Sequence, residues 1–410
     1  MDGSNSDDLD HLFSETVRET KDGSVYGGWR SIRDADAVPL SFGFPYPDSF
    51  PNDELVSAAE SLFEYEGDCA LQYGGGEYAD ALPEVIVDRA RDRGIDCTTS
   101  QLHLTNGATN AIDTVCQTFL DPGDTVFVES PTFMGALRLF RNYGVDIEGC
   151  EMDADGLDVE ALADELAARD AAGEPLPKLL YTIPNFHNPT GVTLSAERRR
   201  RLLELAATYD FLVLEDDPYG QLRYDGSEPP PIRALDRTGR AIRANTFSKT
   251  IAPGVRTGWI IAEESFVEQF ERINAGGEPS YTRGLIARYA EDGRLERAID
   301  ELCAGYRERR DRMIESLAER MPAGTTWSDP DGGFFVWVTF PAGVDAEAML
   351  SDAIDEGVTY LPGSFFYAGD GGARHARLSF SHASPAAIDE GIAALATAVR
   401  AETSPVEADD

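Results

Sequence analysis

The chain has 410 residues, 42% of them apolar, and its 74 acidic side chains against 35 lysines and arginines give a formal net charge of −39. This length allows two domains and a large core. Strong acidity with only three lysines is typical of proteins from halophiles, because acidic surfaces stay hydrated and soluble where salt screens their repulsion. The charge argues against a basic nucleic-acid-binding face and indicates a habitat, not a reaction.

The five cysteines are widely scattered, so the sequence indicates neither a disulfide framework nor a zinc site. The first residues lack the positive charge and the apolar run of a secretory signal. No segment approaches the length of a transmembrane span. We therefore expect a cytoplasmic protein without a metal ion, a membrane anchor or a nucleic-acid partner.

Between residues 54 and 292, short apolar runs alternate with helical patterns. Four of these runs are typical of buried strands: 125–128, 178–183, 211–214 and 258–261. A helix is expected over 196–208, with Ser195 as its N-cap. This alternation predicts an α/β fold with a mostly parallel sheet between helices.

After Gly293 the pattern changes to one long helix that runs toward Pro322. Strand-like runs at 334–338 and 376–380 follow, and a closing helix is expected over 385–400. These elements predict a small α+β domain built from both chain ends. The expected division is an N-terminal arm and part of the small domain (1–53), the large domain (54–292), the C-terminal part of the small domain (293–402) and a disordered tail (403–410).

Lys249 lies in the segment Asn-Thr-Phe-Ser-Lys-Thr, with hydroxyl side chains beside it and Arg256 seven residues further on. Because lysine is so rare in this chain, the position must need an amine. A guanidinium carries charge equally well but cannot lose its proton and act as a nucleophile. An amine beside an anion-binding arginine suggests a phosphorylated carbonyl cofactor. On this segment alone, a surface lysine in a polar loop is the alternative.

Three further segments carry polar groups at the ends of expected strands. Gly107 opens a helix after an apolar stretch, so the backbone amides there form an anion site. Asn188 begins the turn-forming sequence Asn-Pro-Thr-Gly. Asp216 follows the apolar run 211–214, which places a carboxylate at the carboxyl edge of the sheet, where open α/β sheets bind ligands. Each segment by itself could be an ordinary turn.

Together these segments resemble the class I and II aminotransferases, which are fold type I enzymes that use pyridoxal 5′-phosphate (PLP). The resemblance extends from about Leu40 to Arg400, and the separate signatures occur in the family's order. The Phe-Ser-Lys segment and the run at 330–337 are most similar to the subgroup of 2-aminoadipate and other broad-specificity aminotransferases.

The resemblance implies a role for each matching residue. Lys249 would hold PLP and move the substrate's α-proton, Asp216 would pair with the pyridine nitrogen, and Tyr219 would reach the phenolate oxygen. The other expected cofactor contacts are Gly107, Ala108, Thr109, Phe133, Asn188, Thr246, Ser248 and Arg256, with Tyr73 from the neighbouring subunit. The expected substrate contacts are Gly43, Asn188 and Arg377, whose guanidinium would bind the α-carboxylate.

The chain departs from the family pattern at Phe133, where relatives often carry tyrosine, so this ring can stack on the cofactor but cannot donate a hydrogen bond. His187 is more readily structural than catalytic, because Lys249 already supplies a base. Glu215 and Asp217, on either side of Asp216, are expected to be solvated or structural.

The resemblance implies a homodimer that moves an amino group from an L-amino acid to a 2-oxo acid, with 2-oxoglutarate as the expected acceptor. A PLP-dependent β-lyase is an alternative, because the same fold and cofactor support that chemistry. A non-catalytic effector-sensing domain fits less well, because no DNA-binding segment precedes Leu40. The sequence leaves the amino donor open.

Overall fold

The computed structural model describes residues 7–14, 32, 35–274, 277 and 279–403. In this part of the chain, a seven-stranded sheet has the order β2-β10-β9-β8-β7-β3-β4. Its strands are β2 (Leu102–Thr105), β3 (Thr125–Glu129), β4 (Asp146–Cys150), β7 (Leu179–Thr182), β8 (Leu212–Asp216), β9 (Ala241–Thr246) and β10 (Gly258–Ile261). The sheet is parallel from β9 to β4, and β10 runs antiparallel to both of its neighbours. The predicted strands and the mostly parallel sheet are confirmed.

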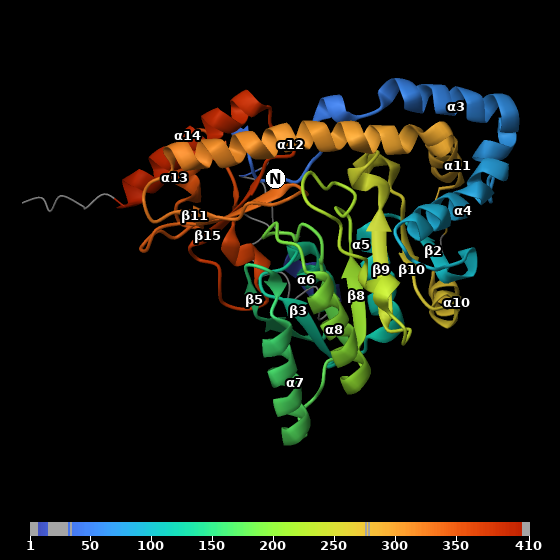
Figure 1. Cartoon of the computed structure of the whole chain (residues 1–410), viewed down its shortest axis with the longest axis horizontal. Coiled ribbons are helices and arrows are strands. Elements are labelled where there is room, and N and C mark those ends of the chain that lie inside the picture. Colours follow the sequence, from blue (N-terminus) through green and yellow to red (C-terminus); the bar gives the residue numbers. More distant parts are fainter. Residues whose placement is uncertain (1–6, 15–31, 33–34, 275–276, 278, 404–410) are drawn as a thin grey trace, which may run out of the picture.

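Helices cover both faces of this sheet (Figure 1). Val126 and Val128 of β3 pack into the apolar cluster of α5, α6 and α10, whereas Phe127 between them packs into the cluster of α7 and α8. Burial on both faces explains why the strands are continuous apolar runs. The helices are α3 (Asn52–Glu66), α4 (Glu77–Asp92), α5 (Ala108–Phe119), α6 (Met134–Asn142), α7 (Val159–Ala172), α8 (Ala196–Tyr209), α9 (Ile232–Leu235), α10 (Glu264–Ile273) and α11 (Ser280–Ala290).

The predicted helix start at Ser195 is confirmed, because its side chain accepts a hydrogen bond from the Arg198 amide at 3.3 Å. Short elements connect the larger ones. They are η1 (Asp7–Leu12), η2 (Pro47–Ser49), η3 (Gly67–Leu71), η4 (Thr99–Gln101), β5 (Met152–Asp153), β6 (Gly156–Leu157), η5 (Phe247–Lys249), η6 (Pro253–Val255) and η7 (Glu291–Gly293). No helix in the described ranges is both long and apolar enough to cross a membrane.

A second lobe combines residues from near both ends of the chain. The long helix α12 (Arg294–Arg320) lies beside the closing helix α14 (Pro385–Thr403), as Figure 1 shows. Both helices match the prediction. β1 (Val38–Pro39) pairs with β13 (Val358–Thr359), which joins an early segment to the C-terminal part. The other elements are β11 (Thr326–Trp327), β12 (Phe335–Thr339), α13 (Leu350–Asp355), β14 (Leu361–Pro362), η8 (Gly363–Phe366) and β15 (His375–Ser379).

The strands β11, β12, β15 and β14 form an antiparallel sheet in that order, and β12 and β15 are the two strand-like runs predicted from the sequence. The domain boundaries expected from the sequence stay predictions. Residues 1–6 and 404–410 lie outside the described residues, and so does most of the segment between 15 and 34.

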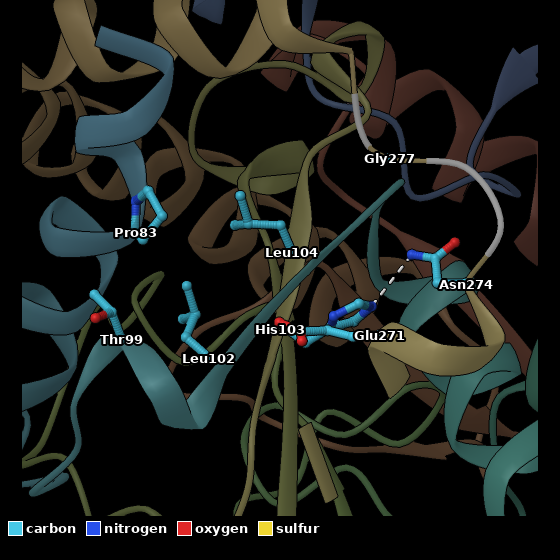
Figure 2. Close-up of a pocket in the computed structure, with 8 residues that line it drawn as sticks. All are labelled: Pro83, Thr99, Leu102, His103, Leu104, Glu271, Asn274 and Gly277. Carbon is cyan, nitrogen blue, oxygen red and sulfur yellow. Dashed lines mark hydrogen bonds between the residues drawn. The ribbon is translucent and has the colours of Figure 1, made fainter. Parts of the chain in front are cut away.

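A cavity of about 380 Å³ lies beside the edge strand β2 (Figure 2). Asn274, which follows α10, donates a hydrogen bond to Nε2 of His103 at 3.2 Å, and burial lowers the pKa of this histidine. The cavity is lined by Pro83, Thr99, Leu102, His103, Leu104, Glu271, Asn274 and Gly277. None of these lining residues is a predicted site residue. The cavity therefore lies at the edge of the sheet, apart from the predicted site around Lys249.

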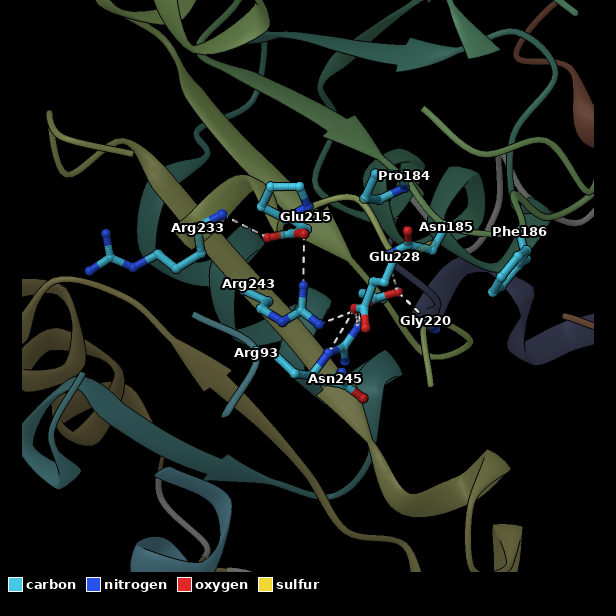
Figure 3. Close-up of polar contacts among 12 residues, drawn as sticks. Arg93, Pro184, Asn185, Phe186, Glu215, Gly220, Glu228, Arg233, Arg243 and Asn245 are labelled. Atoms are coloured by element: carbon cyan, nitrogen blue, oxygen red, sulfur yellow. Dashed lines mark hydrogen bonds and ion pairs between the residues drawn. The ribbon is translucent and has the colours of Figure 1, made fainter. Parts of the chain in front are cut away.

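The two carboxylates that flank Asp216 in the sequence, Glu215 and Asp217, are buried, and Figure 3 shows Glu215 facing the guanidinium of Arg243. Arg243 lies opposite Glu215 in the β8–β9 register and donates to it at 2.7 Å, and the same guanidinium donates to Asp217. Glu215 also accepts the amides of Ile232 and Arg233, each at 3.0 Å. Of the two alternatives expected for these carboxylates, the structural one is confirmed and the solvated one is wrong, because strand pairing places an arginine between them.

The same ion network holds the loop that carries Asn188. Asp217 accepts from the side-chain amide of Asn185 at 2.9 Å, and Arg199 of α8 donates to the Asn185 side-chain oxygen at 2.7 Å. Arg199 also donates to the carbonyl of Pro184 at 2.8 Å. Because these groups are buried, their hydrogen bonds are strong and fix the loop against β8.

Replacing Arg243 with Met should destabilise the protein by about 3–5 kcal/mol, because the buried Glu215 would lose its ion-pair partner and Asp217 would keep only the longer ion pair with Arg93 at 3.5 Å. Urea denaturation in molar KCl measures this change. The control is Arg201→Met, which removes a partly exposed arginine of α8 that pairs with Glu160 of α7 and with Glu204 and should leave the midpoint nearly unchanged. Equal effects of the two substitutions would mean that the network adds little to stability.

Candidate active site

Lys249 lies at the end of the short helix η5, directly after β9. The hydroxyl of Thr246 caps this helix by accepting the Ser248 amide at 3.1 Å, which fixes the backbone just before the lysine. The Lys249 ammonium Nζ donates to the carbonyl of Gly43 at 2.9 Å. This hydrogen bond joins two segments that are 206 residues apart.

The electrostatic surroundings of Lys249 favour loss of its proton. Burial, which is the largest cause, and the positive charges of Arg377 and Arg256 together lower the pKa of Lys249 to about 8, and Asp216 acts in the opposite direction. An amine with this pKa is partly neutral near pH 7 and can act as a nucleophile or a base. The structure therefore brings Lys249, Arg256, Arg377 and Asp216 within electrostatic reach of one another.

Asp216 ends β8 with a buried carboxylate whose two oxygens differ. Oδ2 accepts a hydrogen bond from the hydroxyl of Tyr181 on β7 at 2.6 Å. Oδ1 is buried and has no hydrogen-bond partner in the described part of the chain. The pKa of Asp216 is raised to about 7, mainly by burial; the Tyr181 hydrogen bond opposes this rise and the charge of Asp217 adds to it. A buried acceptor of this kind needs a donor, which a bound ligand with a protonated nitrogen would supply.

Anion-binding groups gather where α5 begins. Gly107 is the N-cap of α5 with φ +88°, and a Cβ there would lie 2.8 Å from Nη2 of Arg256. Only glycine leaves room for this guanidinium. Arg256 donates to the carbonyl of Asn106 at 2.8 Å, and the hydroxyls of Thr246 and Ser248 lie 2.9 Å apart.

The first turn of α5 contains Ala108 and Thr109, so its amides adjoin Gly107 and the guanidinium of Arg256. Amides in the first turn of a helix have no partners within the helix and carry partial positive charge. With Arg256, they provide the donors and the positive charge that a phosphate group requires.

Arg377 on β15 lies among buried groups on the side of the second lobe. Its Nη1 donates to Oδ1 of Asn188 at 2.8 Å, and its Nη2 donates to the carbonyl of Ser41 at 2.6 Å. Its Nε is buried without a partner in the described residues, and burial lowers the pKa of Arg377 to about 9. The guanidinium also lies 4.1 Å from the ring centroid of Phe335. A buried cation with a free donor favours an anionic ligand.

Three other predicted site residues, Tyr219, Phe133 and Tyr73, have different surroundings. Tyr219 is buried beside Lys249, whose Nζ lies 5.8 Å from the Tyr219 ring centroid. Phe133 immediately precedes α6, and its ring packs against Gly135. Tyr73 is 99% exposed, so its ring packs on no other described part of this chain.

Sequence reasoning missed Tyr181, because an apolar strand gives no sign that its tyrosine hydroxyl meets a carboxylate on the next strand. The structural reading of His187 agrees with its surroundings. His187 is buried between Oε2 of Glu129 at 3.1 Å and the hydroxyl of Thr190 at 2.9 Å. It therefore holds the Asn188 loop against the end of β3.

The two neighbouring aspartates should respond differently to pH in the cofactor-free protein. The pKa of Asp216 is raised to about 7 from an ordinary value of 3.8, so this group makes the protein progressively less stable as the pH rises from about 4 to about 7, and the full cost is present above pH 7. Asp216→Asn should therefore raise the melting temperature more at pH 8 than at pH 5, with a gain of up to about 4 kcal/mol at pH 8 and less than half of that at pH 5.

The control is Asp217→Asn. The pKa of Asp217 is lowered, in spite of its burial, by Arg243 and Arg93, so the stability that it contributes is present above its ordinary pKa and is lost only in more acidic solution. This variant should be destabilised equally at pH 5 and pH 8. Melting curves at both pH values measure the difference, and a pH-independent effect of Asp216→Asn would contradict the raised pKa.

Comparison with known proteins shows which family this chain is similar to. A sequence model of the family described as aminotransferase class I and II matches residues 37–395. Aromatic-amino-acid aminotransferase 1 of Thermococcus litoralis is 36% identical over 96% of this chain and 95% of its own length. The structure of Pyrococcus horikoshii kynurenine aminotransferase in complex with PMP has a TM-score of 0.91 and 36% identity, and covers 97% of this chain and 99% of that one.

LysN, the α-aminoadipate aminotransferase of Thermus thermophilus complexed with N-(5′-phosphopyridoxyl)-L-leucine, has a TM-score of 0.84 at 27% identity and covers 95% of this chain and 98% of that one. The groups present in this chain fit PLP, because the open oxygen of Asp216, the amine of Lys249 and the donors around Gly107 suit a ring nitrogen, an aldehyde and a phosphate. The chain therefore belongs to the class I and II aminotransferases, and it is a fold type I enzyme that transfers amino groups with PLP as its cofactor.

Proposed function

We propose that this enzyme transfers the amino group of an L-amino acid to 2-oxoglutarate and that Lys249, Asp216 and Arg377 carry the reaction. The observation that supports this assignment most strongly is the electrostatic position of Lys249. Its pKa is lowered by burial and by Arg377 and is raised by Asp216, so a base, a cation and a carboxylate act on the same small volume. These are the groups that removal of a proton beside an α-carboxylate requires.

Each cofactor contact has a proposed role. PLP, when bound, supplies an electron sink for the negative charge that forms at the substrate's α-carbon. Lys249 holds the cofactor and moves the α-proton, Oδ1 of Asp216 pairs with the ring nitrogen, and Tyr219 and Asn188 reach the phenolate oxygen. Phe133 stacks on the ring. The proposed phosphate contacts are Gly107, Ala108, Thr109, Thr246, Ser248 and Arg256.

Arg377 and Gly43 are proposed to position the substrate. The buried guanidinium of Arg377 has a free Nε that can donate to an α-carboxylate, which both an amino acid and a 2-oxo acid carry. A Cβ at Gly43 would lie 2.5 Å from the ring of Phe335, so only glycine allows this carbonyl to approach Lys249. The relatives are named for aromatic amino acids, kynurenine and α-aminoadipate, and these are the donors to assay first.

A second copy of the chain is proposed to complete the site. Tyr73 is fully exposed, and α3 and η3, the elements that precede it in the chain, carry further exposed apolar side chains: Val56, Phe63, Tyr65 and Leu71. A group of this kind favours a protein interface. In a homodimer, Tyr73 would reach the phosphate bound by the partner subunit. We further propose that the enzyme works in the cytoplasm of a halophile, where molar salt screens its net charge of −39.

Borohydride reduction of the holoenzyme, followed by peptide mapping, should place the reduced cofactor on Lys249, because this is the lysine with a lowered pKa beside the anion-binding groups. Lys249→Ala should abolish transamination. A label on Lys21 or Lys178 would contradict the assignment of the active site. Release of ammonia and a 2-oxo acid without any amino acceptor would instead indicate the β-lyase reaction.

The double variant Val56→Asp with Leu71→Asp should be monomeric and should retain less PLP, because a dimer interface would bury two new charges. We expect the dimer dissociation constant to rise at least about a hundredfold. Light scattering in molar KCl measures the assembly, and visible absorbance measures the bound cofactor. The control Thr208→Asp adds a charge to the exposed face of α8 and should leave both unchanged. A double variant that stays dimeric would show that α3 and η3 form no interface.

A further inference from the structure

The hydrogen bond between Tyr181 and Asp216 joins two neighbouring strands at the centre of the sheet. In the parallel pairing of β7 and β8, Tyr181 lies opposite Leu214, and Asp216 follows two residues later on the same face of β8. Tyr181 is fully buried, Asp216 is 3% exposed, and the hydroxyl lies 2.6 Å from Oδ2. The strand backbones therefore fix this contact, and no mobile loop takes part in it.

The surroundings of Asp216 offer it little positive charge. Charged and titratable groups act on Asp216 from each element packed against it. Asp217 is its neighbour in the chain, Tyr181 belongs to β7, Glu129 to β3 and Arg243 to β9. Lys249 and Tyr219 act on it from within the site. Arg243 donates to Glu215 and Asp217, and Lys249 donates to Gly43. Tyr181 is the residue that donates a hydrogen bond to the Asp216 side chain in the described part of the chain.

We propose that Tyr181 is a positioning residue for Asp216: its hydroxyl occupies Oδ2, leaves Oδ1 alone to face the ring nitrogen, and keeps the carboxylate ionised. This inference rests on the proposed role of Asp216 in the site. A proton lies between the carboxylate and the ring nitrogen, and its position depends on which of them is more basic. A donor on Oδ2 stabilises the negative carboxylate, so the proton stays on the nitrogen.

The alternative is that Tyr181 is only a core side chain, since its ring packs edge to face with Phe140 at 5.6 Å. Tyr181→Phe separates the two roles, because it keeps the ring and removes only the hydroxyl. Tyr360→Phe is the matched control. Tyr360 is also fully buried and donates at 2.6 Å, but to the carbonyl of Ala346 in the second lobe.

The test is ¹⁵N NMR of the holoenzyme reconstituted with PLP labelled at its ring nitrogen. In the Tyr181→Phe variant, the resonance should move from the wild-type position toward that of the Asp216→Asn variant, because the proton moves from the nitrogen to the carboxylate. The Tyr360→Phe resonance should stay at the wild-type position. Turnover should fall about tenfold in Tyr181→Phe and remain unchanged in Tyr360→Phe.

The outcomes separate the two proposals. If Asp216→Asn leaves the resonance unchanged, the proposed role of Asp216 is wrong. If Asp216→Asn moves the resonance and Tyr181→Phe does not, Tyr181 is only a core residue and the inference is overturned.

A second measurement applies if Tyr181→Phe retains no cofactor. Loss of the hydroxyl should raise the pKa of Asp216 above its value of about 7, so the cofactor-free variant should lose more stability at pH 8 than at pH 5. Tyr360→Phe should lose the same amount at both pH values. Equal losses for Tyr181→Phe at the two pH values would also overturn the inference.

Discussion

The arrangement of the site depends on how the structure separates three consecutive acidic residues at the end of β8. Alternation along a strand sends Glu215 and Asp217 to one side and Asp216 to the other. Arg243 neutralises the first two from the adjacent strand, whereas the side chain of Asp216 accepts, within the described residues, the hydroxyl of Tyr181 alone. Glu215 and Asp217 are therefore structural carboxylates paired with Arg243, whereas Asp216 is held by Tyr181 and keeps one oxygen without a partner in the described residues.

This separation also explains how distant segments meet at Lys249. The ion network behind β8 extends through Asn185 and Arg199, and so holds the loop in which Asn188 accepts from Arg377. Arg377 in turn belongs to the second lobe, whose early segment supplies the Gly43 carbonyl to Lys249. Buried hydrogen bonds of this kind stabilise a site only when every charged group has a partner. Oδ1 of Asp216 and Nε of Arg377 have no hydrogen-bond partner among the described residues, and ligands are therefore expected at these two atoms.

Much of the fold could be predicted from the sequence, because strands buried on both faces are apolar runs and Ser195 carries a recognisable helix cap. Strand direction could not be predicted, since the run 258–261 has the same composition whether it is parallel or, as β10 is, antiparallel. The site segments were recognisable because glycine, asparagine and lysine occur in a distinctive order. The burial of Glu215 and Asp217 was missed because, in so acidic a chain, nothing in the sequence distinguishes a buried carboxylate from a solvated one. The contact of Tyr181 with Asp216 depends on strand register, which single-strand patterns do not contain.

We expect the open oxygen of Asp216, oriented by Tyr181, to pair with the cofactor's ring nitrogen. A high-resolution crystal structure of the holoenzyme would show this contact. The ring nitrogen should lie within hydrogen-bond distance of Oδ1 of Asp216 while the Tyr181 hydroxyl remains on Oδ2. A ring nitrogen paired with Asp217 or Glu129, or a Tyr181 hydroxyl that has left Asp216, would contradict it.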